Sequence, residues 1–489
     1  MDRREFLKGS AAVAGGALLG QSRLGDLSFS RARPLRLRSE RMLDRPASES
    51  SIDTLVVLVL ENRSFDHLLG FLGEDEGYLE AGRRRFGKSF HIAARIHERY
   101  EDAAGNSEPT RDVFKLLRSE DAALRGCRYK VPGHTWDEGR VQRKKGFLAK
   151  GTGNDAFAAT YFDGESIPHH RVIGQHFTVM DHYHASLLGP TFPNRQYVHS
   201  AQSEGMKGDP GPLKTGIFSA ETIWDRLGAA GVPAMYYYTD LPILRLWGTR
   251  MLPFIASVDR YFEQAAAGTL PNVVMVDPSF GGANRTDAHP RGNMLLAIEF
   301  VFSVVGALLR SPQWERSALV ITYDEWGGFF DHVPPPQLAD SRASRNEADN
   351  FGQAGFRAAS ALLSPYSAGN QVDHTLYDHT SILRFIEWRF LGAPAAGTSG
   401  RSGEWWLTKR DRHAHPIGQT LRTDPVDLEP PSLSVSSDVG TRLTAPCSVV
   451  DEDETDPFRQ DPSFTEEIAR DHPPATHRPW ESASAGLAD

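Results

Sequence analysis

The sequence contains little cysteine and no long apolar run. Cys127 and Cys447 are its only cysteines, and their wide separation lacks the short spacing of cysteine metal motifs. Two cysteines do not make a disulfide framework, so the chain is not a disulfide-rich secreted scaffold. They form either one bridge, which an exported protein would allow, or none. No apolar run reaches the roughly 20 residues that a membrane-spanning helix needs, so we expect no integral membrane span in the mature protein.

The chain also lacks an excess of basic residues. It has 54 lysines and arginines against 63 aspartates and glutamates, which gives a formal net charge of −9. A nucleic-acid-binding protein would typically show a basic stripe, so this balance argues against nucleic acid as a partner. The length of 489 residues and the hydrophobic content of 40% suffice for one large domain or two medium ones.

Residues 1–45 are predicted to be an export signal and a linker. Arg3 and Arg4 precede a small, mildly apolar stretch of twelve residues, Gly9 to Gly20, in the manner of a twin-arginine signal. Twelve residues cannot span a bilayer. We therefore expect the twin-arginine machinery to export the folded chain to the periplasm, the cell surface or the medium. The alternative is a basic, disordered N-terminus, and no clean cleavage site marks the mature start.

Residues 50–430 are predicted to form one catalytic domain of the α/β class. Short apolar runs alternate with segments of helical spacing, which indicates a doubly wound, mostly parallel sheet flanked by helices. We expect strands at 55–60, 234–238, 272–276 and 317–323, and helices at 222–231, 293–310 and 381–390. Pro, Gly, Ser and Asp accumulate after Gly392, so residues 431–489 are predicted to be an extended or loosely ordered tail.

Polar oxygens follow two of the predicted strands directly. Glu61 and Asn62 come after the first strand, and Asp324 and Glu325 come after the last. Open α/β sheets bind ligands at the carboxyl ends of their strands, and carboxylate and amide oxygens suit a hard or borderline cation. The pattern predicts a cation site. Alternatively, Asn62 caps the following helix while Glu61 faces solvent.

Two further segments carry groups that could act on a phosphate. Thr191 stands between two prolines, where its hydroxyl is restrained, and such a hydroxyl is a usable nucleophile if a metal lowers its pKa. Arg195 nearby could pair with phosphate oxygens. Asp331 and His332 follow Asp324-Glu325 in a glycine-containing loop that resembles a metal or catalytic cluster. The competing interpretations are a structural turn with a surface arginine and an ordinary acidic loop.

Histidines in loops are the last candidates. His134 and His289 lie in turn-like segments from which they could reach the sheet edge. His374 is a weaker candidate, since it could instead support the predicted helix at 381–390. Each of these could also be an ordinary surface histidine.

Four motifs in this chain resemble the bacterial phosphoesterase family that contains phospholipases C and a secreted acid phosphatase. They are ENRSFDH (61–67), GPTFPNR (189–195), TYDEWGGFFDHVPPP (322–336) and YDHTSILRFIEWRF (377–390). The resemblance covers about residues 50–392, with the motifs in the family's order. It implies an alkaline-phosphatase-like fold with the site at the carboxyl ends of the strands.

The resemblance also implies roles for individual residues. The metal ligands would be Glu61, Asn62, Thr191, Asp324 and Glu325, around one divalent ion: Ca²⁺, Mg²⁺, Mn²⁺ or Zn²⁺. Thr191 would be the nucleophile, and His134 and His289 would hold phosphoryl oxygens or protonate the leaving group. Arg195, His332 and His374 are the expected substrate contacts.

The expected function is therefore metal-dependent hydrolysis of phosphate esters through a phospho-threonine intermediate. Phospholipase C-type cleavage of phospholipids is the leading hypothesis. The alternatives are an acid phosphatase that acts on phosphomonoesters and a non-catalytic secreted binding protein on the same fold. Phe192 and Trp326 depart from the family pattern, which puts substrate choice in doubt. They, with Trp136, Phe329 and Phe330, could line a lipid or choline pocket or belong to the core.

Overall fold

An eight-stranded sheet organises the chain. This computed structural model describes residues 39–96, 114–116, 130–164, 167–211, 213–281, 285–290, 292, 294–398 and 404–431. The twin-arginine stretch, nearly all of the predicted tail and both cysteines lie outside the described residues. The described residues belong to one compact unit, while the predicted boundaries at 50 and 430 stay a prediction.

The strand order is β10-β4-β9-β8-β1-β7-β5-β6. The strands are β1 (Thr54–Leu60), β4 (Thr178–Met180), β5 (Ala234–Tyr238), β6 (Ile255–Ser257), β7 (Val273–Val276), β8 (Ser317–Tyr323), β9 (Ala361–Leu363) and β10 (Gln371–Asp373). Only β9 runs antiparallel to its neighbours in this sheet. A separate parallel pair joins β2 (Phe114–Leu116) to β3 (Thr160–Phe162). The predicted fold class, a mostly parallel sheet flanked by helices, is confirmed.

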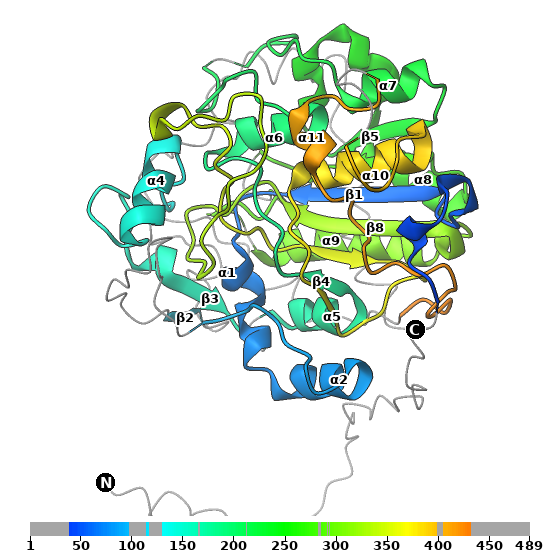
Figure 1. The fold of residues 1–489 in the computed structure, drawn as a ribbon, viewed down its shortest axis with the longest axis horizontal. Coiled ribbons are helices and arrows are strands. Elements are labelled where there is room, and N and C mark those ends of the chain that lie inside the picture. Colours follow the sequence, from blue (N-terminus) through cyan, green and yellow to red (C-terminus); the bar gives the residue numbers. More distant parts are fainter. Residues whose placement is uncertain are drawn as a thin grey trace, which may run out of the picture. The chain divides into compact units, whose positions relative to one another are not determined.

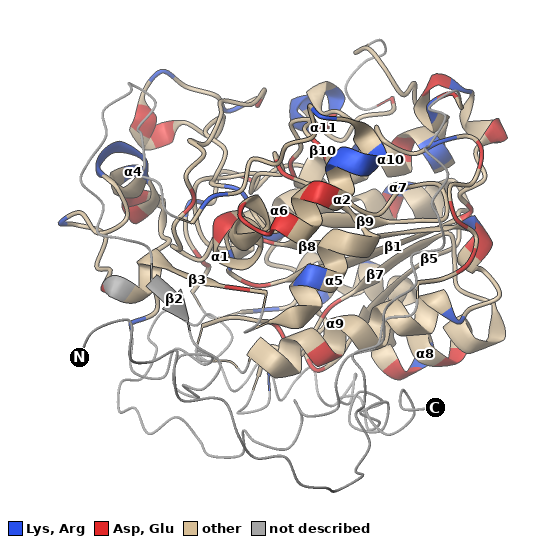
Figure 2. Ribbon diagram, turned by 90° about the horizontal axis from the view of Figure 1, so that it is seen from below, with Lys and Arg blue, Asp and Glu red and all other residues tan. Residues whose placement is uncertain are grey.

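Helices cover both faces of the large sheet. They are α1 (Phe65–Leu69), α2 (Glu76–Phe86), α4 (Trp136–Lys145), α5 (Pro168–His176), α6 (Thr191–Ser200), α7 (Ile223–Ala229), α8 (Val258–Ala267), α9 (Met294–Leu309), α10 (His379–Leu391) and α11 (Lys409–His413). Figure 2 shows α7 and α10 on one side of the strands and α8 and α9 on the other. None of the described helices combines the length and the hydropathy that crossing a membrane requires.

The two central strands explain where the site forms. β1 and β8 lie side by side near the middle of the sheet (Figure 1), and every residue of both is buried. Strands covered on both faces are typically continuous runs of valine, leucine and isoleucine, which is why both could be predicted. Their parallel register pairs Thr54 with Ser317 and Leu60 with Tyr323. The residues that follow the two strands therefore leave the sheet together.

The segment around Thr191 differs from one of its two interpretations. A structural turn was the competing interpretation, but Thr191 is the first residue of helix α6. Pro193 is compatible with a helix there because the first turn leaves its backbone N–H groups without intrahelical partners. Thr191 consequently sits at the positive end of the α6 dipole.

Candidate active site

Glu61, Asn62, Asp324 and Glu325 come together at the carboxyl ends of β1 and β8, and all four are buried. The backbone N–H of Asn62 donates to Asp324 Oδ1 at 3.0 Å, and the N–H of Asp324 donates to the Leu60 carbonyl at 3.0 Å. Asn62 adopts a left-handed backbone with φ of 57°, a conformation in which asparagine is enriched. These bonds lock the two strand ends, with their four oxygen-bearing side chains, to each other.

Thr191 completes this group from a third element. Its hydroxyl donates to Glu61 Oε2 at 3.0 Å and lies 3.3 Å from Asn62 Oδ1. Asn194 holds the start of α6 in place, since its side chain accepts from the Leu187 N–H at 2.9 Å and donates to the Gly189 carbonyl at 2.8 Å. The structure thus brings the predicted nucleophile to the predicted metal ligands.

Arg195 lies one helical turn after Thr191 and is buried beneath the same group. Its guanidinium donates to Glu61 Oε1 at 2.8 Å, to Asp277 Oδ1 at 2.9 Å and to Asp324 Oδ2 at 3.4 Å. Burial works to lower the pKa of Arg195, but its carboxylate neighbours, Asp277 foremost, outweigh burial and raise that pKa. The side chain is a permanent cation that holds carboxylates from three strand ends. Its predicted contact with substrate stays a prediction.

His134 approaches from the other side of Asn62. Its Nε2 lies 3.2 Å from Asn62 Nδ2 and 3.8 Å from Glu325 Oε1. Its Nδ1 lies 2.7 Å from the Pro132 carbonyl, which can only accept, so the neutral ring carries its lone pair on Nε2. Burial works to lower the pKa of His134, but the carboxylate of Glu325 and the Pro132 carbonyl overcome it and raise the pKa.

The described residues place too little positive charge near the carboxylates of this site to neutralise them. Glu325 Oε2 accepts from the Gly327 N–H at 2.7 Å, whereas its buried Oε1 has no hydrogen-bond partner. Burial raises the pKa of Glu325 to about 8, against the opposing effect of His134 and aided by Asp324. Burial and Asp324 likewise hold the pKa of Glu61 well above its ordinary range. A buried, unpartnered carboxylate oxygen among acidic side chains, an amide and a hydroxyl fits a divalent cation.

His289 lies in the loop after β7, next to the backbone of this group. Its N–H donates to Asp287 Oδ1 at 3.1 Å, and its Nδ1 lies 2.8 Å from the Pro290 carbonyl. The Asp287 carbonyl in turn accepts from the N–H of Glu61 at 2.7 Å. The structure therefore ties the loop of His289 to the first predicted metal ligand, and its Nε2 carries the lone pair in the neutral ring.

His332 lies in a neighbouring cluster. Its Nδ1 is hydrogen-bonded to Asp66 Oδ2 of α1. Arg357 donates to Asp66 Oδ1 at 3.1 Å and to Asp331 Oδ1 at 2.9 Å. The loop after Glu325 thus does not bring Asp331 and His332 to one cluster with Glu325. It pairs them with α1 and a buried guanidinium, and a substrate contact by His332 stays a prediction.

His374 follows β10, which β4 and β9 separate from β8. Its Nδ1 lies 2.9 Å from Asp181 Oδ1. The structure places it with the end of β4 and not with the ends of β1 and β8. Its predicted contact with substrate also stays a prediction.

The aromatic residues near the motifs are packed in the interior. Trp326 and Phe330 belong to a small buried cluster, and Phe192 and Phe329 belong to the main core. Trp136 is also buried, against Phe351. The sequence left two interpretations open for these five residues, a lipid or choline pocket and the core. The structure matches the core.

Two further residues support the site, and of these only Asp277 was not singled out from the sequence. Asp277 follows β7 and anchors Arg195. His379, the first residue of α10, has its Nε2 2.6 Å from the Asp324 carbonyl. The available signal for Asp277 was its place directly after a predicted strand, the same signal that marked Glu61 and Asp324.

Two family sequence models match this chain. Residues 52–391 match the sequence model of the Phosphoesterase family, and residues 1–20 match the twin-arginine translocation pathway signal. Non-specific phospholipase C3 of Arabidopsis thaliana is 28% identical over 430 residues, 81% of this chain and 79% of the relative. Phospholipase C B of Mycobacterium tuberculosis is 28% identical over 452 residues, 81% of this chain and 82% of the relative.

A third relative and one solved structure extend the comparison. The non-hemolytic phospholipase C of Burkholderia pseudomallei is 28% identical over 455 residues, 80% of this chain and 61% of the relative. A protein in the alkaline phosphatase superfamily from Vibrio parahaemolyticus matches with a TM-score of 0.29 and 12% identity, covering 47% of this chain and 65% of that one.

Proposed function

The chain belongs to the Phosphoesterase family, and we propose that it is a phospholipase C-type phosphodiesterase with Thr191 as its nucleophile. The family and its phospholipase C relatives make it a phosphoric ester hydrolase. Its twin-arginine signal directs it out of the cytoplasm, to the periplasm or the medium. The hydrogen bond from the Thr191 hydroxyl to Glu61 Oε2, at 3.0 Å in a buried acidic group, is the observation that carries the proposal.

Ester hydrolysis at phosphorus needs an in-line nucleophile, neutralised phosphoryl oxygens and a protonated leaving group. Glu61, Asn62, Thr191, Asp324 and Glu325 would hold one divalent cation. Such an ion, when bound, supplies charge neutralisation and lowers the pKa of a coordinated hydroxyl. Arg195 keeps Glu61 and Asp324 in place from below, so in this proposal it positions ligands.

The chain's own residues then divide the remaining work. The Thr191 oxygen attacks phosphorus, and its proton moves toward Glu61 Oε2, the acceptor of its hydrogen bond. His134, whose Nε2 faces the site beside Asn62, protonates the departing alkoxide, with His289 as the second candidate. The imidazole that has given up its proton then takes one from water, which releases phosphate monoester from Thr191.

The relatives' names favour a phosphodiester substrate, because the similar curated proteins of plant and bacterial origin are phospholipases C. The test uses purified, exported protein and three substrates: phosphatidylcholine vesicles, p-nitrophenyl phosphorylcholine and p-nitrophenyl phosphate. Release of diacylglycerol and of nitrophenol from the diester, well above release from the monoester, is the expected result. Faster hydrolysis of the monoester would replace this proposal with an acid phosphatase. No release from any ester, across pH and added metals, would leave a binding protein.

A further inference from the structure

A second group of potential metal ligands lies at the carboxyl ends of β4 and β10. These strands are parallel neighbours, with Asp373 paired to Met180. Asp181 and His182 follow β4 directly, and His374 follows β10, so the same strand-end arrangement that unites Glu61 and Asp324 recurs here. One strand, β9, separates β4 from β8, which is a distance of about 10 Å at the usual strand spacing.

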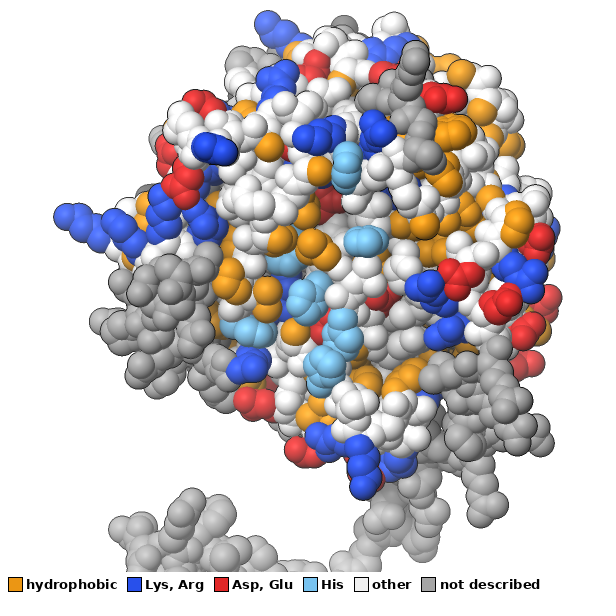
Figure 3. Space-filling view, in the orientation of Figure 1, with side chains coloured by type: hydrophobic (Ala, Val, Ile, Leu, Met, Phe, Trp, Pro, Cys, Tyr) orange, Lys and Arg blue, Asp and Glu red, His pale blue; other side chains and the backbone are white. Residues whose placement is uncertain are grey.

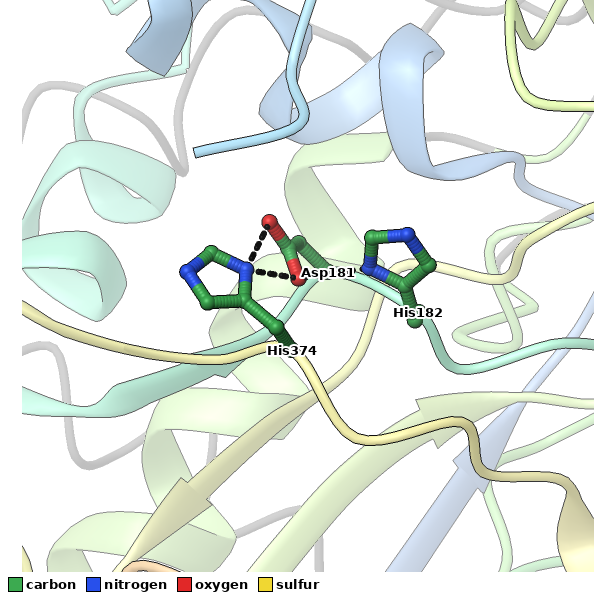
Figure 4. Close-up of side chains that lie close together, drawn as sticks. All are labelled: Asp181, His182 and His374. Carbon is green, nitrogen blue, oxygen red and sulfur yellow. Dashed lines mark hydrogen bonds and ion pairs between the residues drawn. The ribbon is translucent and has the colours of Figure 1, made fainter. Parts of the chain in front are cut away.

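The carboxylate of Asp181 is the centre of this group. It is fully buried, and its Oδ1 lies 2.9 Å from Nδ1 of His182 and 2.9 Å from Nδ1 of His374. The N–H of Ala93 donates to its Oδ2 at 2.7 Å. Figure 4 shows the two imidazoles on either side of the carboxylate, each with Nδ1 turned toward it. One ligand atom from each of the three residues lies within 4.8 Å of the others.

Solvent reaches this group. The side chains of His182 and His374 are 34% and 39% exposed. His374 also lines a cavity of about 260 Å³ together with His91 and Phe90, and the ring of His91 stacks on His374 with centroids 4.2 Å apart. Histidine side chains gather in the middle of the face drawn in Figure 3. An ion could therefore enter without unfolding any element.

We propose that Asp181, His182 and His374 form a second metal site, for a borderline divalent ion of the Zn²⁺ class. Two imidazoles and one carboxylate favour Zn²⁺, Ni²⁺ or Cu²⁺ over Ca²⁺ or Mg²⁺. The ligand set differs in kind from the oxygen-rich group around Thr191, so the two sites select different ions. Three protein ligands leave a fourth position for water, as in open zinc sites.

The geometry needs little adjustment. Tetrahedral zinc with bonds of about 2.0 Å separates its ligand atoms by about 3.3 Å, and the two Nδ1 atoms already lie 2.9 Å from Asp181 Oδ1. The ion takes the place of the two hydrogen-bonded protons. In each neutral ring the single N–H moves from Nδ1 to Nε2, so this tautomer change leaves the number of protons unchanged.

The neighbouring cluster of Asp66, Asp331 and His332 makes a useful contrast. Its ligand atoms are equally close together, but the guanidinium of Arg357 bonds both of its carboxylates. At Asp181, Arg357 donates to the backbone carbonyl at 2.8 Å, while the carboxylate receives imidazole and backbone N–H groups. Among the described residues no guanidinium bonds the carboxylate of Asp181, although the charge of Arg357 acts on it from a distance, so a cation can replace the two imidazole protons.

A bound ion would join the ends of β4 and β10. β10 is a three-residue strand at the edge of the sheet, so a bond to His374 would fasten an element that few backbone pairs hold. Because the ion binds the folded chain, it would stabilise the fold by an amount that rises with the logarithm of its free concentration. This inference does not depend on the proposed reaction.

The experiment measures zinc per chain in the full exported protein after dialysis against buffered free zinc. Wild type is compared with His182→Gln/His374→Gln, and His415→Gln serves as a control at an exposed histidine outside the group. Wild type and the control should bind one equivalent more than the double variant, and zinc should raise the melting temperature of those two proteins by more than it raises that of the double variant. Equal zinc content in all three proteins would overturn the proposal.

Asp181→Asn provides a second variant in case the double variant does not fold. It retains an oxygen and the side chain's volume but not its charge, so zinc affinity should fall by about tenfold or more. Cobalt(II) serves as the spectroscopic probe. Its visible bands should change between wild type and Asp181→Asn. Identical cobalt spectra and zinc affinities in a folded Asp181→Asn protein would show that the group is only a hydrogen-bonded cluster.

Discussion

The Thr191 hydroxyl donates a 3.0 Å hydrogen bond to Glu61 Oε2, although the two residues are 130 positions apart. Glu61 is fixed by its strand end, and Thr191 is fixed by the start of α6. Arg195, one turn further along α6, bonds the other oxygen of the same carboxylate at 2.8 Å. A single helix thus presents a hydroxyl and a guanidinium to the two sides of one carboxylate, which fixes the direction of the hydroxyl.

Replacing Thr191 with alanine should abolish turnover, because it removes the atom that attacks phosphorus. The expected loss in kcat is on the order of 10⁴-fold or more. Thr191→Ser keeps the oxygen and should retain measurable activity. Thr269→Ala, an exposed threonine after α8, is the matched control. Mass spectrometry of reactions with the choline diester, quenched in acid, should find a phosphorylcholine group on the peptide that contains Thr191. Full activity in folded Thr191→Ala would refute the proposed mechanism.

The sequence predicted most of what positions this site. β1 and β8 could be identified because both are buried on two faces and so are apolar throughout, and their polar successors mark the sheet edge. The nearness of Thr191 to Glu61 could not be derived from spacing, because it depends on how α6 packs across the end of the sheet. Resemblance to a family supplied that relationship, and the structure brings the residues together.

Other features depend on tertiary structure that no local pattern encodes. Arg195 looked like a surface or phosphate-binding arginine, yet carboxylates from three separate strand ends surround it. His332 stands only seven residues after Glu325 but pairs with Asp66. The turn between them explains this, since Gly327 and Gly328 have φ of 64° and 71°. A Cβ on Gly327 would lie 2.1 Å from the Asn62 carbonyl, so only glycine allows the chain to turn away there.

Replacing Arg195 with glutamine should destabilise the fold strongly. The substitution leaves buried carboxylates without their cation, a change that typically costs about 3–5 kcal/mol. Urea unfolding of metal-free protein measures the loss. Arg316→Gln, at an exposed ion pair with Asp53, should change stability by no more than about 0.5 kcal/mol. If Arg195→Gln instead left stability intact and raised only KM, Arg195 would be a substrate contact, as predicted from the sequence.

Chelation should remove activity. Glu325→Gln should weaken metal binding without destabilising the metal-free protein. Burial penalises the ionised Glu325 carboxylate, whose Oε1 lacks a partner, so a neutral amide should leave the metal-free melting temperature unchanged or higher. The catalytic barrier should rise by several kcal/mol. Glu387→Gln is the control, because burial and Asp411 hold the pKa of Glu387 well above its ordinary range and so favour its neutral form. Retention of full activity after exhaustive chelation would rule out a metal-dependent reaction.

Buried histidines that stay neutral in the fold should each lower the stability as pH drops below about 6.5, while buried carboxyls with a raised pKa, such as Glu325, act in the opposite direction. Burial lowers the pKa of His199, with a further contribution from Arg195, to about 3. Burial likewise lowers the pKa of His170 and His184 to about 3. Between that value and the ordinary pKa of about 6.5, the unfolded chain binds protons that the folded chain does not. Each of these histidines therefore lowers the free energy of unfolding by up to about 1.4 kcal/mol for each unit by which the pH falls within this window.

His199 offers the sharpest test of that pH dependence. Its Nδ1 accepts a hydrogen bond from the indole N–H of Trp224 at 3.0 Å. Protonation of Nδ1 would therefore place two N–H donors opposite each other. His199→Asn keeps an acceptor near Trp224 but cannot titrate. Urea midpoints between pH 8 and pH 4 should show a shallower decline for His199→Asn than for wild type, while His415→Gln should follow wild type. Parallel declines in wild type and His199→Asn would mean that other groups control acid unfolding. A steep decline also argues against an enzyme adapted to strongly acidic conditions, and so against the acid phosphatase alternative.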